Sequence, residues 1–413
     1  MPARLSRAAL LGGRTPKVFR GSSERAVAPS ETLARVAPLL SRFGITRVAN
    51  VTGLDRIGVP VYQAIRPNAR SLSVSQGKGV DAASSKVSAI MEAIELSYAE
   101  RPTLPLRLGA YDELAAEGAA DPMELPLSRP SAYRVGHPLL WAPASDVSSD
   151  GDAWVPFELV HACATAPLIA GSGCFVRSTN GLASGNTGAE AVLHGLCEVV
   201  ERDALALFAA RSAEFRDAGR LDLDTVADAT CREALARFDR AEFSAFAWNV
   251  TSDVGIPAVH VLLADRSREA ALNPSPSALG SGCHPVAATA LLRALTEAAQ
   301  GRLGVIAGSR DDLTRTRYAA MQSSLADERF RREAERAGLR NFRELPSFEA
   351  DSVEGDLAHV LARLAAVGCP RVLAVDLSGD DVPFVVVRVV VPGLEGPSNS
   401  PAYSPGRRAR AVS

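Results

Sequence analysis

The sequence feature that most constrains the fold is a pattern that occurs three times, in which a glycine-rich segment precedes a predicted helix carrying glutamates. The three glycine and glutamate pairs are Gly79 and Glu92, Gly185 and Glu198, and Gly282 and Glu297. The two members of a pair are 13 residues apart in the first two copies and 15 in the third. The repetition indicates three related helices that present acids from matching positions.

Helices and strands follow one another along the whole chain. The predicted helices cover residues 31–43, 81–100, 189–210 and 286–303, and the first should end at Gly44 because glycine suits the residue after a helix. Apolar runs predict strands at 45–51, 59–65, 243–250, 258–264, 372–377 and 384–391. Composition predicts glycine turns at 77–79 and 180–187, an exposed loop at 142–153 and a frayed arm at the N-terminus.

Charge and cysteine content exclude several classes of protein. Forty-five basic and 47 acidic residues leave a net charge of -2, which argues against binding of nucleic acid or of an anionic membrane surface. No apolar run approaches the roughly 18 residues that a membrane-spanning helix needs. The six cysteines include no CxxC pair, which argues against a zinc or iron–sulfur site. We expect reduced thiols in a cytoplasmic protein.

The glutamates of the first two helices come in pairs three residues apart, so both carboxylates of a pair lie on one helical face. Their neighbours are apolar, and a buried carboxylate needs a counter-charge or takes up a proton. Six helical acids face two arginines: Glu92, Glu95, Glu190, Glu198, Glu201 and Glu297, against Arg202 and Arg293. Mg2+ with phosphate oxygens would correct this excess of negative charge, which favours a metal–nucleotide site between helices. Solvated surface helices with ordinary salt bridges are the alternative.

The first glycine segment, Gln76-Gly-Lys-Gly79, contains one of only three lysines in the chain. It is not a Walker A motif, because the upstream glycine and the Ser or Thr after the lysine are absent. It opens a predicted helix, whose N-terminus favours anions, so Lys78 is a candidate phosphate contact. The sequence has no HExxH, GxSxG or GxGxxG motif. His194 and Cys197 have the spacing of a nucleophile and its base, although a buried core pair is the simpler interpretation.

Three stretches taken together resemble the YcaO family. They are Ser75-Gln-Gly-Lys-Gly79 with Ser88, Glu92 and Glu95; Asn180-Gly-Leu-Ala-Ser-Gly-Asn-Thr187 with Glu190, Glu198, Glu201 and Arg202; and Gly282-Cys-His-Pro285 with Arg293, Glu297, Gln300 and Arg302. The resemblance covers about residues 45 to 396. It implies an α+β fold, in which mixed or antiparallel sheets are packed by the helices that carry the acids.

The resemblance also implies the cofactors and the site, since the family binds ATP without a P-loop. The residues that match the family's nucleotide contacts are Lys78, Ser88, Asn186, Arg202 and Arg293. Those that match its Mg2+ ligands, direct or through water, are Glu92, Glu95, Glu190, Glu198, Glu201 and Glu297. Glu201, Arg202 and Arg293 are the expected catalytic residues.

Members of the family activate a backbone amide of a peptide. A nucleophile adds to the amide carbon, and the resulting oxyanion attacks the γ-phosphate of ATP. External sulfide then gives a thioamide, whereas a neighbouring Cys, Ser or Thr side chain gives an azoline. Azoline-forming members often end in a PxPxP tail that is absent here, and the segments 44–47 and 52–60 are similar to members that work with a TfuA partner. We prefer thioamidation with a TfuA-type partner; an azoline-forming cyclodehydratase, with an E1-like partner, is the alternative.

The motifs predict one catalytic unit rather than several domains. Residues 1–44 are expected to form an N-terminal arm and helix, 45–396 a single catalytic domain with one composite ATP site, and 397–413 an irregular tail. A peptide or protein substrate and a homodimer are implied by the resemblance. The sequence names neither the peptide nor the sulfur source.

Two other classes of function remain open at this point. One is a non-catalytic accessory factor of a methylthiotransferase, as some relatives have been described. The other is a metal-dependent hydrolase that uses the same acids without ATP.

Overall fold

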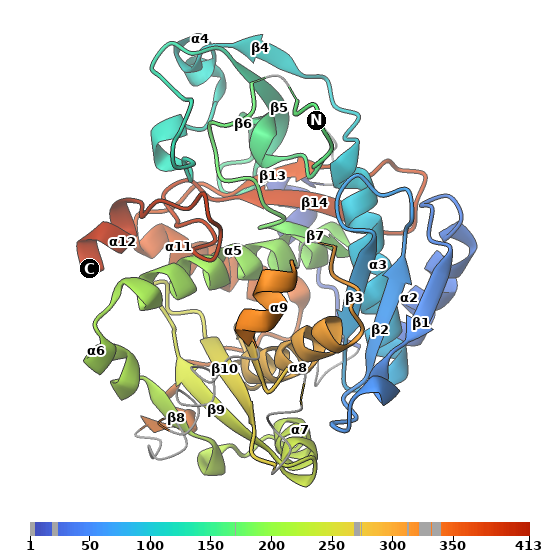
Figure 1. The fold of residues 1–413 in the computed structure, drawn as a ribbon. Coiled ribbons are helices and arrows are strands. Elements are labelled where there is room, and N and C mark those ends of the chain that lie inside the picture. Colours follow the sequence, from blue (N-terminus) through green and yellow to red (C-terminus); the bar gives the residue numbers. More distant parts are fainter. Residues whose placement is uncertain are drawn as a thin grey trace.

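The structure is a computed structural model, which describes residues 5–18, 24–169, 171–267, 273, 275–311, 314–321, 332 and 340–413. Within these residues the chain forms three β-sheets, with helices packed between and around them (Figure 1). The predicted α+β fold, with mixed and antiparallel sheets packed by the acidic helices, is confirmed.

The three sheets differ in size and in strand order. The first is antiparallel in the order β1-β2-β3, formed by β1 (Arg47–Asn50), β2 (Val61–Ile65) and β3 (Val74–Lys78). The second has the order β11-β10-β9-β8-β12, with β8 and β12 parallel: β8 (Arg220–Asp222), β9 (Phe243–Asn249), β10 (Ala258–Asp265), β11 (Ser277–Cys283) and β12 (Arg340–Asn341). The third is antiparallel in the order β4-β5-β13-β14-β7, with β6 beside β5: β4 (Arg107–Gly109), β5 (Leu139–Asp146), β6 (Gly151–Pro156), β7 (Leu182–Gly185), β13 (Leu373–Asp376) and β14 (Val385–Val390).

Three long helices carry the acids, as predicted: α3 (Ala82–Glu100), α5 (Gly188–Ala210) and α8 (Ala287–Ile306). The shorter helices are α1 (Arg7–Leu11), α2 (Pro29–Val36), α4 (Tyr111–Leu114), α6 (Ala213–Ala218), α7 (Ala229–Arg240), α9 (Arg315–Met321), α11 (Val353–Ala366) and α12 (Arg407–Val412). The predicted helix at 31–43 is shorter than expected, because Pro38 lacks an N–H group and only a 3-10 turn (Ala37–Leu39) follows α2.

The threefold pattern of the sequence becomes a ring of three strand–helix units. Strands β3, β7 and β11 each lie at the end of their own sheet, and each leads directly into α3, α5 or α8. Each helix packs against its own strand and also touches the strand of another unit, with α3 on β7, α5 on β11 and α8 on β3. Matching positions of the three helices therefore face a common centre.

The glycines of the pattern serve close packing rather than turns, which corrects the sequence prediction. Gly77 lies inside β3, where a Cβ atom would stand 2.0 Å from the backbone nitrogen of Ala89 in α3. Gly282 lies inside β11, where a Cβ would stand 2.2 Å from the carbonyl oxygen of Ala290 in α8. The predicted loop at 180–187 likewise contains β7. Only glycine lets each helix lie directly on the strand that precedes it.

The exposed loop predicted at 142–153 is also wrong, because these residues form most of the β5–β6 hairpin. Its small side chains are buried rather than solvated: Ala142 is fully buried, and Ala144 and Ala153 are nearly so. They pack in a core that includes Trp141 and α3. The loop predicted from composition is correct only for the few residues between β5 and β6.

Both termini are more ordered than the sequence predicts. The N-terminal arm is not frayed in its described part, because Leu5 and Leu10 are fully buried and α1 packs against α5 and α11. In the tail predicted as irregular, residues 407–412 form α12, where Arg408 pairs with Asp203. Long-range contacts of this kind are not encoded in local composition. The division of the chain at residues 44 and 396 stays a prediction.

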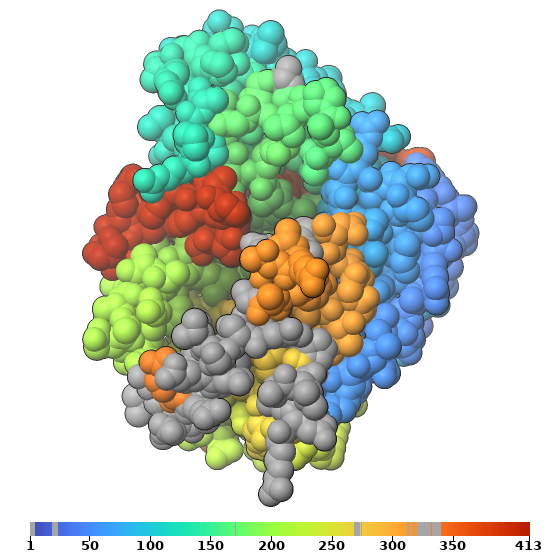
Figure 2. Space-filling view, viewed as in Figure 1, coloured from blue at the N-terminus to red at the C-terminus, as the bar shows by residue number. Residues whose placement is uncertain are grey.

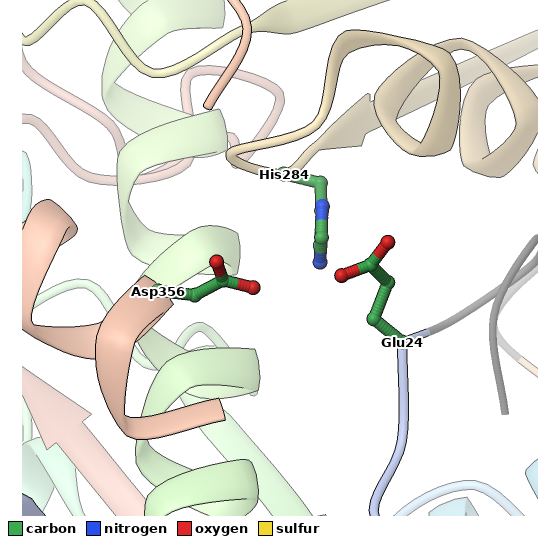
Figure 3. Close-up of side chains that lie close together, drawn as sticks. All are labelled: Glu24, His284 and Asp356. Carbon is green, nitrogen blue, oxygen red and sulfur yellow. The ribbon is translucent and has the colours of Figure 1, made fainter. Parts of the chain in front are cut away.

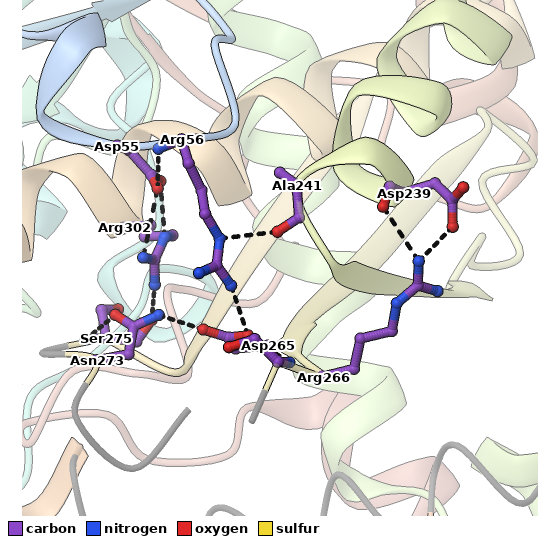
Figure 4. A network of polar contacts seen from close by, with 10 residues as sticks. Asp55, Arg56, Asp239, Ala241, Asp265, Arg266, Asn273, Ser275 and Arg302 are labelled. Atoms are coloured by element: carbon purple, nitrogen blue, oxygen red, sulfur yellow. Dashed lines mark hydrogen bonds and ion pairs between the residues drawn. The ribbon is translucent and has the colours of Figure 1, made fainter. Parts of the chain in front are cut away.

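A polar network joins the first sheet to the second (Figure 4). Arg302 of α8 donates from Nε to the carboxylate of Asp55 at 2.7 Å, and from Nη1 to the carbonyl oxygen of Ser275. Arg56 donates to Asp265 of β10 at 2.8 Å and to the carbonyl oxygen of Ala241 at 2.8 Å. The segment 52–60, which the sequence links to TfuA-associated relatives, thus fixes one sheet against another.

Helix α5 forms the centre of the core, between the second and third sheets (Figure 1). Its buried residues Leu196 and Val200 pack in the same cluster as Trp248 and Val387. All six cysteines are free and buried. In the described ranges, every helix is too short or too polar to cross a bilayer.

Candidate functional site

The three motif helices surround a cavity of about 780 Å³. Residues of α3, α5 and α8 line it, together with residues between 25 and 32 and the loops at 161–164 and 177–179. Figure 2 shows that early (blue), middle (green) and late (orange) parts of the chain meet on one face of the molecule. The cavity therefore exists only in the complete fold.

Five of the six predicted metal ligands line this cavity: Glu92, Glu95, Glu198, Glu201 and Glu297. Glu190 does not line it and is only 2% exposed. One of its carboxylate oxygens accepts the N–H of Ala26, and the other accepts both the backbone and the side-chain N–H of Asn186. The structure places Glu190 behind Asn186, and its role as a metal ligand stays a prediction.

The cavity acids have few partners for their negative charge. Glu95 accepts a hydrogen bond from the Ser184 hydroxyl at 2.5 Å. Glu297 pairs with the Lys78 ammonium at 2.5 Å and accepts the N–H of Ser281 at 3.3 Å. Arg202 lies 3.6 Å from Glu198 and 3.4 Å from Glu201. Glu297 is therefore a cavity acid with a cation at short hydrogen-bonding distance, whereas Arg202 stays more than 3 Å from Glu198 and Glu201.

Burial raises the pKa values of four of these carboxyls. The pKa of Glu95 rises to about 8, and the pKa values of Glu92 and Glu201 rise to about 7. Burial also raises the pKa of Glu198, although Arg202 opposes the change. Burial acts in the same direction on Glu297, but Lys78 and Arg202 outweigh it and hold the pKa of Glu297 below its usual value. At pH 7 Glu95 is therefore mostly protonated and Glu92 and Glu201 are about half protonated, whereas Glu297 is ionised.

The structure does not show the excess of negative charge that the sequence predicts for this site. Among the described residues, six basic ones line the cavity beside the five acids: Arg25, Lys78, Arg177, Arg202, Arg293 and Arg310. The sequence count omitted four of them, because they lie outside the three helices and reach the cavity only through tertiary contacts. A site with several carboxylates and several cations suits an anion that arrives with a metal ion.

All five predicted nucleotide contacts line the cavity, namely Lys78, Ser88, Asn186, Arg202 and Arg293. Asn186 is held on both sides, since Glu190 accepts its N–H groups and Thr32 donates to its side-chain oxygen at 2.9 Å. Nε of Arg293 is buried and has no hydrogen-bond partner among the described residues. Such an unsatisfied donor in a cavity wall indicates a site for an acceptor-rich ligand.

His194 and Arg25 also line the cavity; the sequence predicts His194 only as a base for Cys197 or as a core residue, and it gives no signal for Arg25. His194 lies between two guanidinium groups, with its Nδ1 3.2 Å from Arg25 and its Nε2 3.0 Å from Arg293. Burial, Arg293 and Arg25 lower the pKa of His194 well below its usual value, so the ring is neutral. The available signal was its spacing, one helical turn before Glu198 on the same face. Cys197, in contrast, lies in the apolar core as the simpler interpretation had it.

A second cluster of charged residues lies outside the cavity. Figure 3 shows the side chains of Glu24, His284 and Asp356 pointing toward one another. The ammonium group of Lys17 pairs with both carboxylates, at 2.7 Å from Asp356. A lysine already supplies the positive charge here, so we interpret the cluster as an ion-pair anchor and not as a metal centre.

The donor set of the cavity fits Mg2+ and a phosphate chain. Carboxylate oxygens are the hard ligands that Mg2+ prefers, and the metal usually shares them with phosphate oxygens. Arginine and lysine side chains provide the donors that bind the remaining phosphate oxygens. The arrangement can therefore position a metal-bound phosphoryl group beside a second reactant within one cavity.

Comparison with known proteins also supports a site for Mg2+ and a phosphate chain. A family model described as YcaO cyclodehydratase, ATP- and Mg2+-binding, matches residues 76–395. An uncharacterized protein from the tfuA 3′ region of Rhizobium leguminosarum bv. trifolii is 38% identical over 376 residues, covering 90% of this chain and 89% of that protein. An uncharacterized protein of Methanothermobacter thermautotrophicus is 36% identical over 396 residues, covering 94% of this chain and 99% of that protein.

Two solved structures share the fold. YcaO from Methanopyrus kandleri, bound with AMPPCP and Mg2+, matches with a TM-score of 0.72 and 24% identity, covering 92% of this chain and 95% of that chain. A heterocyclase in complex with substrate and cofactor matches with a TM-score of 0.75 and 22% identity, covering 93% of this chain. This chain spans only about half of that heterocyclase, 54% of its length.

Proposed function

The chain belongs to the YcaO family, whose members bind ATP and Mg2+, and from this premise we propose that it activates a backbone amide of a peptide for thioamidation. The observation that carries the proposal is the cavity itself, where five acids from three helices meet six basic residues. We propose that residues 45–396 form one catalytic unit around it, with residues 25–32 completing the wall.

The proposed reaction exchanges the amide oxygen for sulfur. Hydrosulfide adds to the amide carbon, and the carbonyl electron pair moves to oxygen. This oxygen attacks the γ-phosphorus of ATP, and ADP leaves with the electron pair of the broken bond. The sulfur loses its proton, the phosphorylated oxygen departs as phosphate, and a carbon–sulfur double bond forms. One amide, one hydrosulfide and one ATP thus give one thioamide, ADP and phosphate.

The residues of the cavity have distinct proposed roles in this sequence. Glu92, Glu95, Glu198, Glu201 and Glu297 would hold Mg2+, which supplies positive charge to the phosphate oxygens. Arg202 and Arg293 would hold the phosphate chain by paired hydrogen bonds, as guanidinium groups do well. Lys78, the last residue of β3 in the first strand–helix unit, would neutralise a further phosphate oxygen. Glu190 would act indirectly, by fixing the amide of Asn186 toward the nucleotide.

The position of the tail favours thioamidation over azoline formation. Azoline-forming members often have a proline-rich tail that reaches the active site. Here α12 packs on α5, where Arg408 bonds to Asp203 at 2.9 and 3.0 Å and Glu395 accepts the N–H of Ala409. None of the residues that line the cavity comes from 397–413. Residues 397–413 thus pack against α5 and not into the cavity.

A partner protein is part of the proposal. The relative from Rhizobium lies in the tfuA 3′ region, which supports a TfuA-type protein as the partner that supplies sulfide. An E1-like partner would accompany the azoline alternative, and the homodimer stays a prediction. Free cysteines throughout suit a reducing compartment, and we propose the cytoplasm.

The proposal is tested by co-expressing this protein with a TfuA-type protein and with a candidate substrate peptide encoded beside its gene. Intact-mass spectrometry should show the peptide heavier by the difference between sulfur and oxygen, with ADP formed in equal amount. A peptide lighter by one water would instead show that the reaction is azoline formation and not thioamidation. Nucleotide binding without ADP formation would favour the accessory role, and absence of nucleotide binding would leave only the hydrolase.

Glu201→Ala is the matching variant, because it removes one of the acids that line the cavity. We expect it to abolish both ADP release and peptide modification. Glu233→Ala serves as the control, since Glu233 lies on α7 with its side chain 55% exposed, pairs with Arg237 and Arg240, and is not among the residues that line the cavity. Full activity in Glu201→Ala would refute the metal assignment.

A further inference from the structure

We propose that Cys163 carries the sulfur of the reaction as a persulfide, at a site in the cavity wall that it shares with His161. The proposal rests on the proposed function, because it names the route by which sulfur reaches the amide. None of the three sequence motifs includes either residue. Both nevertheless line the cavity, on the loop at 161–164.

Cys163 lies where the wall of the cavity meets the surface of the molecule. The residue itself is 8% exposed, whereas residues 164–168, which follow it, are all exposed. Ala164 donates its backbone N–H to the carbonyl oxygen of Arg70 at 2.8 Å, and Ser71, next to Arg70, also lines the cavity. This position suits a residue that receives sulfur from outside the molecule and releases it into the cavity.

The surroundings of the Cys163 thiol differ from those of the other five cysteines. Its sulfur lies 3.2 Å from the Thr165 hydroxyl, and hydrogen bonds from Thr165 and Arg70 lower the pKa of the thiol below its usual value. None of the other five, all of them within the described ranges, lines the cavity. Burial raises the pKa values of four of them: Cys174, Cys231, Cys283 and Cys369. Because the thiolate is the form that attacks a persulfide, Cys163 is the cysteine best suited to take up sulfur.

His161 gives independent evidence for a ligand in this part of the cavity. It is 2% exposed, and both of its ring nitrogens are buried without a hydrogen-bond partner among the described residues. Burial lowers the pKa of His161 to about 4, and Arg177 and Arg388 act in the same direction, so the ring is neutral at pH 7. A neutral imidazole offers one donor and one acceptor, which match the sulfur atoms and the S–H group of a persulfide.

Arg177 adds positive charge to the same part of the cavity. It lines the cavity and donates from Nη1 to the carbonyl oxygen of Cys163 at 3.3 Å. Positive charge near a cysteine favours the thiolate over the thiol. It would favour the anionic form of a persulfide in the same way.

The proposed sulfur transfer has two stages. In the first, the Cys163 thiolate attacks the outer sulfur of a cysteine persulfide on the partner, whose S–S bond breaks, and the partner's thiolate leaves with the electron pair. In the second, a small thiol of a reducing compartment attacks the inner sulfur and releases hydrosulfide into the cavity. A second thiol then restores Cys163, as the two thiols become a disulfide. These thiols supply the two electrons that the transferred sulfur gains.

Peptide-mapping mass spectrometry tests whether Cys163 takes up sulfur. The reduced full-length protein is incubated with glutathione persulfide, freed of small molecules, alkylated with iodoacetamide and digested. The Cys163 peptide should be heavier than its alkylated thiol form by one sulfur atom, and the other five cysteines are internal controls. Cys163→Ser should carry no added sulfur. His161→Phe should load Cys163 about tenfold more slowly, because the sulfur loses a hydrogen bond.

Thioamide formation by the loaded protein, with the donor removed, is the second test. With substrate peptide, ATP, Mg2+ and dithiothreitol, wild type should form at most one thioamide per loaded chain, and Cys163→Ser should form none. Free sulfide should restore thioamide formation in Cys163→Ser, because hydrosulfide then enters without a carrier. Thermal melting of each variant reports whether it is folded.

Three results would overturn the proposal. They are equal loading of Cys163 and the other cysteines or no loading at all, an unchanged loading rate in His161→Phe, and a folded Cys163→Ser that free sulfide does not rescue. Failure of the wild type to form thioamide with free sulfide would instead refute the proposed function.

Discussion

Binding of Mg2+ with ATP is predicted to release about two protons from this protein at pH 7. In the metal-free cavity the pKa of Glu95 is raised to about 8, and the pKa values of Glu92 and Glu201 to about 7. A carboxyl whose pKa is one unit above the pH is about nine-tenths protonated, and one whose pKa equals the pH is about half protonated. The three carboxyls therefore hold about two protons, which must leave because metal binding requires the carboxylate form.

Isothermal titration calorimetry in buffers of different ionisation enthalpy counts these protons. At pH 9 the release should fall nearly to zero, because all three carboxyls are then ionised before binding. Glu95→Gln should remove about one proton from the count at pH 7, whereas Arg35→Ala should leave it unchanged. ATP titrated with a chelator instead of Mg2+ should release none from these acids. A binding heat at pH 7 that is independent of the buffer would refute the reasoning.

Three further predictions concern packing, charge and pH. Gly77→Ala should lower the free energy of unfolding in urea by about 3 kcal/mol, since its Cβ would stand 2.0 Å from the Ala89 nitrogen, and wild-type stability would contradict the packing described. Lys78→Met should weaken ATP about tenfold in calorimetry, because the phosphate chain loses a charge-assisted hydrogen bond; unchanged affinity would refute Lys78 as a phosphate contact. The melting temperature of the metal-free protein should fall from pH 6 to pH 9, because the raised pKa values let the native state bind more protons than the unfolded state in this pH range. A melting temperature that rises over this range would count against buried acids.

The acids of the site were predictable because their signal is local. The i, i+3 spacing of Glu92 and Glu95 recurs in Glu198 and Glu201, and spacing within one helix decides which side chains share a face. The structure brings these four together with Glu297 in one cavity. The repeated pattern thus supported one prediction about tertiary structure, namely that three similar helices meet at one centre.

The rest of the site depends on contacts between distant segments. Arg25 meets His194 across 169 positions of the chain, and no periodicity connects them. His194 itself fits the pattern of a core residue as well as that of a site residue, because α5 is buried on nearly all sides. Glycine favours turns, so the sequence predicts a turn at Gly77, but close backbone packing against α3 decides its position.

The most direct test of the central claim is the fate of the amide oxygen. A substrate peptide that carries the heavy isotope of oxygen at the modified carbonyl is incubated with this protein, its partner, sulfide, Mg2+ and ATP. If the cavity transfers the γ-phosphoryl group to that oxygen, the released phosphate carries the label in equal amount to the thioamide formed. Unlabelled phosphate alongside thioamide would contradict the account, because the oxygen would then have left by another route.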